Sequence, residues 1–128
     1  MIILELPFPP SNNQYYRTVN NRIVISKKGR AYKKRIIALI EQYGLNQYPI
    51  DYPIIVRVEF MPPDNRVRDS DNFLKGLFDG LTNARFWLDD SLVAEHSVRF
   101  YPKDKNPRAI LYVEPDMENS FTHHPLPQ

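Results

Sequence analysis

Aspartate side chains recur between residues 69 and 90 in a pattern that suits metal-dependent hydrolysis. Asp69 and Asp71 flank the start of a stretch with helical periodicity, and Asp89 and Asp90 come at the start of a later strand. Hard cations such as Mg²⁺ prefer oxygen ligands, and their sites usually combine one or two carboxylates with substrate phosphate oxygens. We therefore expect the two helix-start aspartates and a third carboxylate from the strand end to form a metal site.

A polar stripe runs along the same helical stretch. Asp71, Lys75 and Asp79 lie on one side of it, beside the apolar face rather than opposite it. Carboxylates shielded in this way repel one another unless a positive charge intervenes. The structural alternative is that Asp69 or Ser70 caps the helix while Lys75 pairs with its acidic neighbours. Both interpretations stay open on these residues alone, and Asp79 is the weakest candidate for chemistry.

The positive charge of the chain is concentrated near its N-terminus. Between residues 17 and 35 there are basic residues and no acidic ones: Arg17, Arg22, Lys27, Lys28, Arg30, Lys33, Lys34 and Arg35. This segment suits a polyanion, whereas the acidic residues of 64–90 would repel one unless cations were bound there. The alternative is that both are solvated charged surfaces.

We expect the basic segment to track the phosphates of DNA, and the loop before it to contact bases. The expected phosphate-binding residues are Arg17, Lys27, Lys28, Arg30, Lys33, Lys34 and Arg35. Tyr15, Tyr16 and Arg17 are candidates for stacking on or bracing unpaired bases at a branch point. The alternative is that both tyrosines pack the proline-rich loop PPSNNQYYR (residues 9–17).

Length and composition indicate one globular domain. The chain has 128 residues, of which 42% are hydrophobic and 25% charged, a net charge of +2 and no cysteine. The lack of cysteine excludes disulfide frameworks, thiol nucleophiles and cysteine-ligated zinc, and it suits a reducing compartment. The opening residues lack the basic region of a signal peptide, and the apolar runs are too short to span a bilayer. We therefore expect a cytoplasmic protein.

The hydrophobic pattern predicts an α+β fold, with a mixed β-sheet, two main helices and the order β-(β)-α-β-α-β-β. The expected strands are residues 2–6, 22–26 (a short strand or hairpin arm), 54–61, 92–101 and 108–114, the last two as an antiparallel hairpin. The expected helices are 27–43, capped by Ser26 and stopped by Gly44, and 70–84. Residues 1–115 are expected to form the domain and 116–128 a flexible tail.

Some aromatic side chains near the candidate site are assigned to packing. Phe86 and Trp87 join the second helix to the next strand, where aromatic residues usually belong to the core or to an interface. His96 falls on the apolar side of its strand, so we expect a packed histidine rather than a metal ligand.

Two segments give the chain a resemblance to a known family. LPFPPSNNQYYR near the N-terminus and RDSDNFLKGLFDGLTNARFWLDD in the centre resemble the RusA-like Holliday-junction resolvases, small dimeric endonucleases of bacteria and their prophages. The similarity covers about residues 4–114. It implies a Mg²⁺-dependent endodeoxyribonuclease, with Mn²⁺ as a substitute ion, that resolves four-way DNA junctions in recombination and repair.

The resemblance also assigns roles to individual residues. Asp69, Asp71 and Asp90 match the metal-binding carboxylates of the family, and Lys75 matches its essential lysine, so these four are the expected catalytic residues. Asp89 precedes the matching aspartate and is a weaker candidate. The histidines of the C-terminal tail have no counterpart and are given no role.

Two other functions remain as alternatives. A nucleic-acid-binding module with structural carboxylates would bind DNA irrespective of Mg²⁺ and would never cleave it. A metal-dependent phosphohydrolase of nucleotides would not need so many basic residues beyond its site.

A homodimer is expected, because resolving a junction requires paired nicks and one chain offers one site. The candidate interface residues are Phe73, Phe86, Trp87 and Tyr101.

Overall fold

The computed structural model describes residues 1–118, which form a four-stranded sheet, a two-stranded hairpin and three α-helices. No helix among these residues is long and apolar enough to cross a membrane. Most of the predicted tail, with His123 and His124, lies outside the described residues. At its start, however, Asp116 is buried and its N–H donates to the Pro53 carbonyl at 3.0 Å, so this residue packs on the domain.

The sheet has the order β1-β6-β4-β5. Its strands are β1 (Ile2–Pro7), β4 (Ile54–Met61), β5 (Val93–Phe100) and β6 (Arg108–Pro115). β6 pairs antiparallel with both β1 and β4, and β5 pairs parallel with β4. The predicted mixed sheet of an α+β fold is therefore confirmed, and the strand at 54–61 has the predicted bounds.

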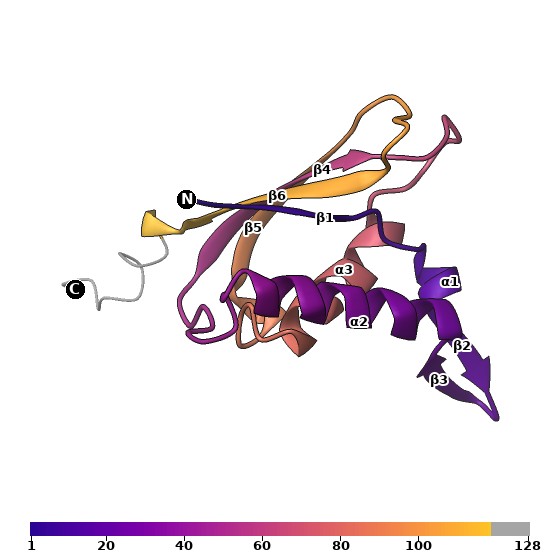
Figure 1. Cartoon of the computed structure of the whole chain (residues 1–128), viewed down its shortest axis with the longest axis horizontal. Helices are drawn as coiled ribbons and strands as arrows, with labels where there is room; N and C mark the ends of the chain where they lie inside the picture. Colours follow the sequence, from indigo (N-terminus) through magenta and orange to yellow (C-terminus); the bar gives the residue numbers. More distant parts are fainter. Residues whose placement is uncertain (119–128) are drawn as a thin grey trace, which may run out of the picture.

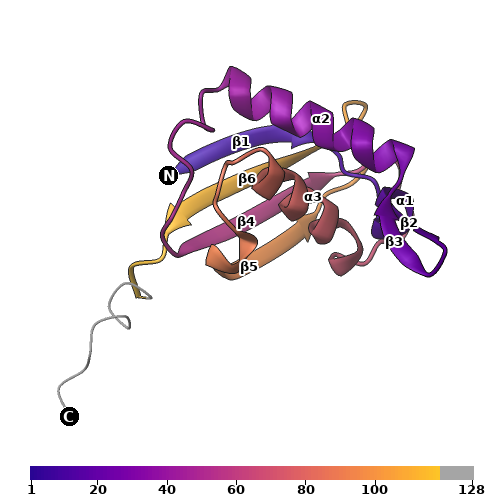
Figure 2. The ribbon, with the colours of Figure 1, turned by 90° about the horizontal axis from the view of Figure 1, so that it is seen from below.

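The predicted hairpin of the last two strands is wrong, because β4 lies between β5 and β6 (Figure 2). A helix connects β4 to β5, and such a crossover favours parallel pairing. β6 then takes a central position and buries Ala109, Leu111 and Val113 on one face. β5, with charged and polar residues, is left at an edge of the sheet, where such residues discourage pairing with other chains.

Both long helices cover the same face of the sheet, as Figure 2 shows. Helix α2 (Lys27–Gln42) begins at the predicted cap, where Ser26 Oγ accepts from the Gly29 N–H at 3.0 Å. Its C-cap is Tyr43, which is followed by Gly44 at φ 70°. Helix α3 (Asp71–Asn83) is the predicted second helix. Its buried residues Leu74, Leu77, Phe78 and Leu81 join Ile36, Ile40 and the inner residues of the strands in one core.

The N-terminal segment contains the predicted hairpin arm near residues 22–26 and, before it, structure that the sequence patterns did not predict. The expected loop includes a short helix, α1 (Asn12–Tyr15), which Ser11 and Gln14 close with a capping box. It leads into a hairpin of β2 (Tyr16–Val19) and β3 (Arg22–Ile25), which projects beyond the start of α2 in Figure 1. Asn20 and Asn21 have positive φ at the hairpin turn, a conformation that asparagine tolerates well.

Candidate active site

Tyr15 fixes the N-terminal segment to both long helices. Its side chain is fully buried, and its ring lies against Gly76 of α3. A Cβ added at Gly76 would lie 2.6 Å from Tyr15 Cδ2, and one added at Gly29 of α2 would lie 2.3 Å from the Tyr15 carbonyl oxygen. Glycine at both positions therefore lets α1 pack between the helices. The proposal that Tyr15 stacks on DNA bases is wrong, because no part of its ring is accessible.

The start of α3 holds two of the predicted site residues. Asp69 Oδ1 accepts a hydrogen bond from the Asp71 N–H at 3.2 Å, whereas the Ser70 side chain makes no capping bond. From α1, Asn12 Nδ2 donates to the Asp71 carbonyl at 3.2 Å. Both aspartates are exposed. The structure thus ties the proline-rich loop to the first turn of α3 and leaves both carboxylates open to solvent.

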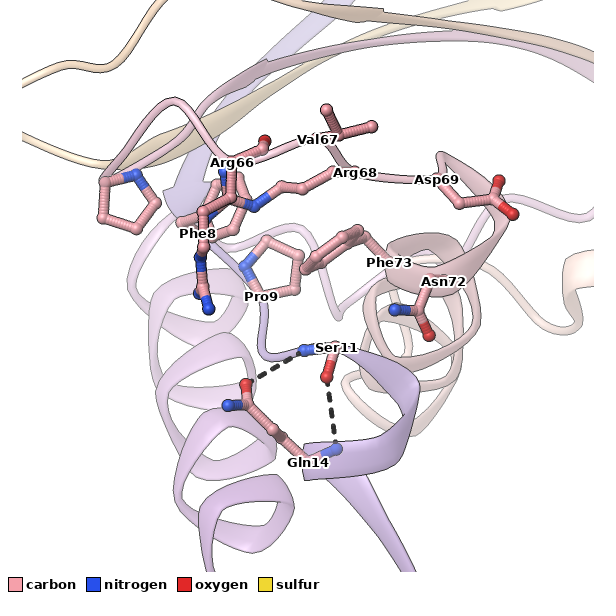
Figure 3. A pocket seen from close by; sticks show the side chains of 11 residues that line it. Phe8, Pro9, Ser11, Gln14, Arg66, Val67, Arg68, Asp69, Asn72 and Phe73 are labelled. Atoms are coloured by element: carbon pink, nitrogen blue, oxygen red, sulfur yellow. Dashed lines mark hydrogen bonds between the residues drawn. The ribbon is translucent and has the colours of Figure 1, made fainter.

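A pocket of about 510 Å³ adjoins Asp69, between the proline-rich loop and residues 63–69 (Figure 3). Arg66, Arg68 and Asn72 contribute polar groups to its wall. The Arg68 side chain is only 8% exposed and binds Asp64 Oδ1 at 2.8 Å. Arginine and amide donors beside a carboxylate suit a phosphate that approaches a metal site.

Lys75, Asp79 and Tyr16 form a contact cluster one turn further along α3. Lys75 Nζ lies 3.3 Å from Asp79 Oδ2 and 4.2 Å from the centroid of the Tyr16 ring. The Tyr16 hydroxyl donates a hydrogen bond to the same Asp79 oxygen. Burial, the hydrogen bond to Asp79 and its charge raise the pKa of Tyr16 far above its ordinary value, so the phenol remains a donor. Sequence reasoning missed this role of Asp79, because Tyr16 is 63 positions away.

Asp89 and Asp90 differ in what they do in the turn η1 (Asp90–Leu92) before β5. Asp89 accepts from the hydroxyl and the N–H of Ser91, and these hydrogen bonds lower its pKa. The pKa of Asp90 is raised, first by burial, then by the charges of Asp89 and Asp79, with Lys75 opposing the shift. Asp90 is therefore coupled electrostatically to the cluster on α3, while Asp89 is engaged in a local cap.

The structure brings together a different set from the predicted metal ligands. Lys75, Asp79 and Asp90 interact electrostatically. Among residues 1–118, no group of three or more histidine, cysteine or acidic side chains lies close enough to hold a metal ion. Asp69, Asp71 and Asp90 are thus not gathered into a ligand set in the isolated chain. Their chemistry nevertheless fits a hard cation, because all three offer carboxylate oxygens. In addition, Lys75 offsets only part of the burial and the neighbouring negative charges that raise the pKa of Asp90.

The predicted DNA-binding cations lie on the surface of the hairpin and α2. Arg17, Lys27, Lys28, Arg30, Lys34 and Arg35 are exposed, and Lys33 is partly exposed. Lys28 and Arg35 line a shallow groove of about 310 Å³ together with Pro9, Pro10 and Gln14. This groove adjoins the pocket at Asp69, because Phe8, Pro9 and Gln14 line both.

The remaining aromatic residues fall into two groups. Phe86, Trp87 and Phe73 are buried in the core of the chain, which removes them as dimer contacts; Trp87 Nε1 donates to Thr82 Oγ1 at 2.7 Å. Tyr101, the remaining candidate, is partly exposed and donates to Glu59 Oε2 at 2.6 Å. His96 is not a core residue, because β5 is an edge strand and leaves it exposed, with its ring centroid 6.0 Å from that of Phe78. Its alternative assignment to an interface stays a prediction.

Comparison with known proteins yields one consistent similarity. Residues 7–114 match the family described as "Endodeoxyribonuclease RusA". The chain is 40% identical over 110 residues to the crossover junction endodeoxyribonuclease RusA of Escherichia coli K12, covering 86% of this chain and 91% of that protein. Proteins with the same description from Shigella sonnei and Enterobacteria phage 82 are each 41% identical over the same shares.

Proposed function

Because this chain belongs to the RusA family of endodeoxyribonucleases, we propose that it resolves four-way DNA junctions in a Mg²⁺-dependent reaction. The relatives named above are crossover junction nucleases, and a basic surface leading to a carboxylate-rich centre suits such a substrate. The proposal also places the protein in the cytoplasm and its role in DNA recombination and repair.

The observation that carries the proposal is that Lys75 of α3 interacts electrostatically with Asp90, in the turn that contacts α3. The lysine extends from the exposed side of α3, and its charge acts on an aspartate from the turn before β5. A cation and a carboxylate from separate elements, next to the first turn of α3, match the needs of phosphodiester hydrolysis. The lysine can balance negative charge on the phosphoryl oxygens, while the carboxylates can hold a metal ion.

Each side chain then has a defined part in the reaction. Asp69, Asp71 and Asp90 would hold Mg²⁺, which supplies an activated water and relieves charge on the phosphate when it is bound. The Lys75 ammonium stabilises the negative charge that develops on the phosphoryl oxygens. Arg66 and Asn72 line the approach from the pocket and would orient the phosphate on its way to Asp69.

We also propose that the active unit is a two-fold symmetric homodimer. A four-way junction needs a nick in each of two opposing strands, and one chain carries one set of site residues. Closed two-fold pairing is the commonest way to hold two identical sites at a fixed separation. A mixed dimer of wild-type and Asp90→Asn chains should bind a junction and nick one strand per binding event. Paired nicks by the mixed dimer, or a monomer in light scattering at working concentration, would contradict the homodimer.

The experiment that tests the proposed function compares three DNA substrates under the same conditions. A synthetic four-way junction, a linear duplex of the same sequence and a supercoiled plasmid are incubated with the protein, with Mg²⁺ or with EDTA. We expect cleavage of the junction only with Mg²⁺, and little cleavage of the linear duplex. Binding without cleavage at any Mg²⁺ or Mn²⁺ concentration would favour a non-catalytic binding module.

A further inference from the structure

Lys75 is held from two directions by residues to which the proposed reaction gives no part. We propose that Tyr16 and Asp79 are positioning residues that hold the Lys75 ammonium in one place on the exposed side of α3 during cleavage. The inference rests on the proposed function, because it takes Lys75 as the active-site lysine. It extends that function to a carboxylate and a phenol in contact with each other and with the lysine.

A lysine in this position needs restraint. Its charge sits on a flexible four-carbon stem, and the Lys75 side chain is 60% exposed. An exposed ion pair four residues apart on a helix is worth only about 0.3–0.5 kcal/mol, so Asp79 alone holds the lysine weakly. The Tyr16 ring adds a second contact from another element, with its centroid 4.2 Å from the ammonium. Together the two contacts restrict the ammonium to one side of α3.

The restraining groups are themselves fixed by the core. Tyr16 follows the buried Tyr15, and the centroids of the two rings are 4.7 Å apart. The Tyr16 N–H, at the end of α1, also donates to the carbonyl of Asn12, the first residue of that helix. Its hydroxyl orients the Asp79 carboxylate, and the raised pKa of Tyr16 keeps the proton available for this bond. The position of the lysine is thereby linked to the segment that also carries Arg17 and the basic hairpin.

The test uses the full-length protein and variants that remove one contact each. Asp79→Asn removes the negative charge, Asp79→Glu keeps it, and Tyr16→Phe keeps the ring but loses the hydroxyl. Single-turnover cleavage of a four-way junction is measured with saturating protein and Mg²⁺, and the junction Kd is measured separately. Because a displacement of about 1 Å can slow an enzyme about a hundredfold, we expect Asp79→Asn to lose between about tenfold and a hundredfold in rate. Tyr16→Phe should lose less, Asp79→Glu should recover part of the rate, and none of the variants should bind the junction more weakly than wild type.

The opposite face of the sheet offers matched controls. There, Arg57 lies 4.1 Å from the centroid of the Tyr112 ring, and Tyr112 hydrogen-bonds to Glu59. Tyr112→Phe and Glu59→Gln therefore remove equivalent contacts away from Lys75 and should leave cleavage unchanged. Nuclear magnetic resonance relaxation of the Lys75 Cε group provides a readout that does not depend on activity. Its order parameter should fall in Asp79→Asn and Tyr16→Phe but not in the two controls.

The outcomes separate this inference from the function on which it rests. If Lys75→Ala cleaves at the wild-type rate, the proposed role of the lysine itself is wrong. If Lys75→Ala is inactive while Asp79→Asn and Tyr16→Phe keep the wild-type rate and lysine order, only the positioning role is overturned. A higher Mg²⁺ requirement in Asp79→Asn would also overturn it, because Asp79 would then act as a metal ligand.

Discussion

The ring of Tyr15 lies directly against Gly76, so closely that a Cβ at this position would come within 2.6 Å of Tyr15 Cδ2. This contact between α1 and α3 sets the position of the neighbouring Tyr16 and, through it, of the polar stripe on α3. Gly76 therefore links the core to the candidate active site, although it carries no chemistry of its own.

Gly76→Ala should destabilise the protein, because the added methyl group overpacks against a buried ring. The expected loss is about 1–3 kcal/mol in the free energy of unfolding, measured by urea denaturation. Gly80→Ala is the matched control, since a Cβ there meets Ile36 at an ordinary 3.6 Å. The control should gain up to about 1 kcal/mol from the better helix propensity of alanine. Equal effects of the two substitutions would show that Tyr15 does not pack as described.

Asp90→Asn should stabilise the protein when no divalent metal is present. The pKa of Asp90 is raised in the folded state by burial and by Asp89 and Asp79, so its ionised form costs folding free energy. The cost is present at pH values above the raised pKa and disappears as pH falls toward the ordinary value of 3.8. Thermal unfolding in EDTA should therefore give the variant a higher Tm at neutral pH, and the difference should vanish in acid. A lower Tm for the variant at neutral pH would mean that Asp90 makes a stabilising contact instead.

Lys75→Ala should abolish junction cleavage without unfolding the protein. Its exposed ion pair with Asp79 is worth about 0.3–0.5 kcal/mol, so the Tm should change little. Cleavage assays and thermal unfolding of the same preparation check both parts. A large fall in Tm with activity retained by the folded fraction would favour the purely structural interpretation of the lysine.

Replacing Lys33, Lys34 and Arg35 with glutamine should weaken binding to junction and duplex DNA alike. These side chains are expected to contact phosphates, and each lost contact reduces the slope of log K against log salt by about 0.9. Binding titrations from low to high salt measure the slope for wild type and variant. An unchanged slope would place the DNA-binding surface elsewhere on the chain.

Local patterns predicted the elements of this fold better than their arrangement. Ser26 marks the start of α2, and alternation of apolar residues marks β4 with its correct bounds. The pairing of β5 and β6 was predicted wrongly, because strand order depends on contacts distant in sequence and a short connection suggested a hairpin. Helix α1 could have been predicted, since Ser11 and Gln14 have the spacing of a capping box.

The candidate site was predicted unevenly for a similar reason. The positions of Asp69 and Asp71 at a helix start follow from the sequence, and so does the neighbouring Lys75. The burial of Tyr15 does not, because it depends on two glycines in different helices that approach only in the fold. The gathering of Asp69, Asp71 and Asp90 around an ion remains a prediction, because within residues 1–118 these carboxylates do not lie close enough together to hold one.

The most direct measurement is the cleavage and binding of one four-way junction by wild-type protein and Asp71→Asn at a fixed Mg²⁺ concentration. Wild type should introduce paired nicks in opposing strands. Asp71→Asn should bind the junction at least as tightly, because the basic surface is intact and one negative charge near the DNA is removed, yet it should not cleave. Full cleavage by Asp71→Asn, or no cleavage by wild type with Mg²⁺, would contradict a metal-dependent junction nuclease centred on the start of α3.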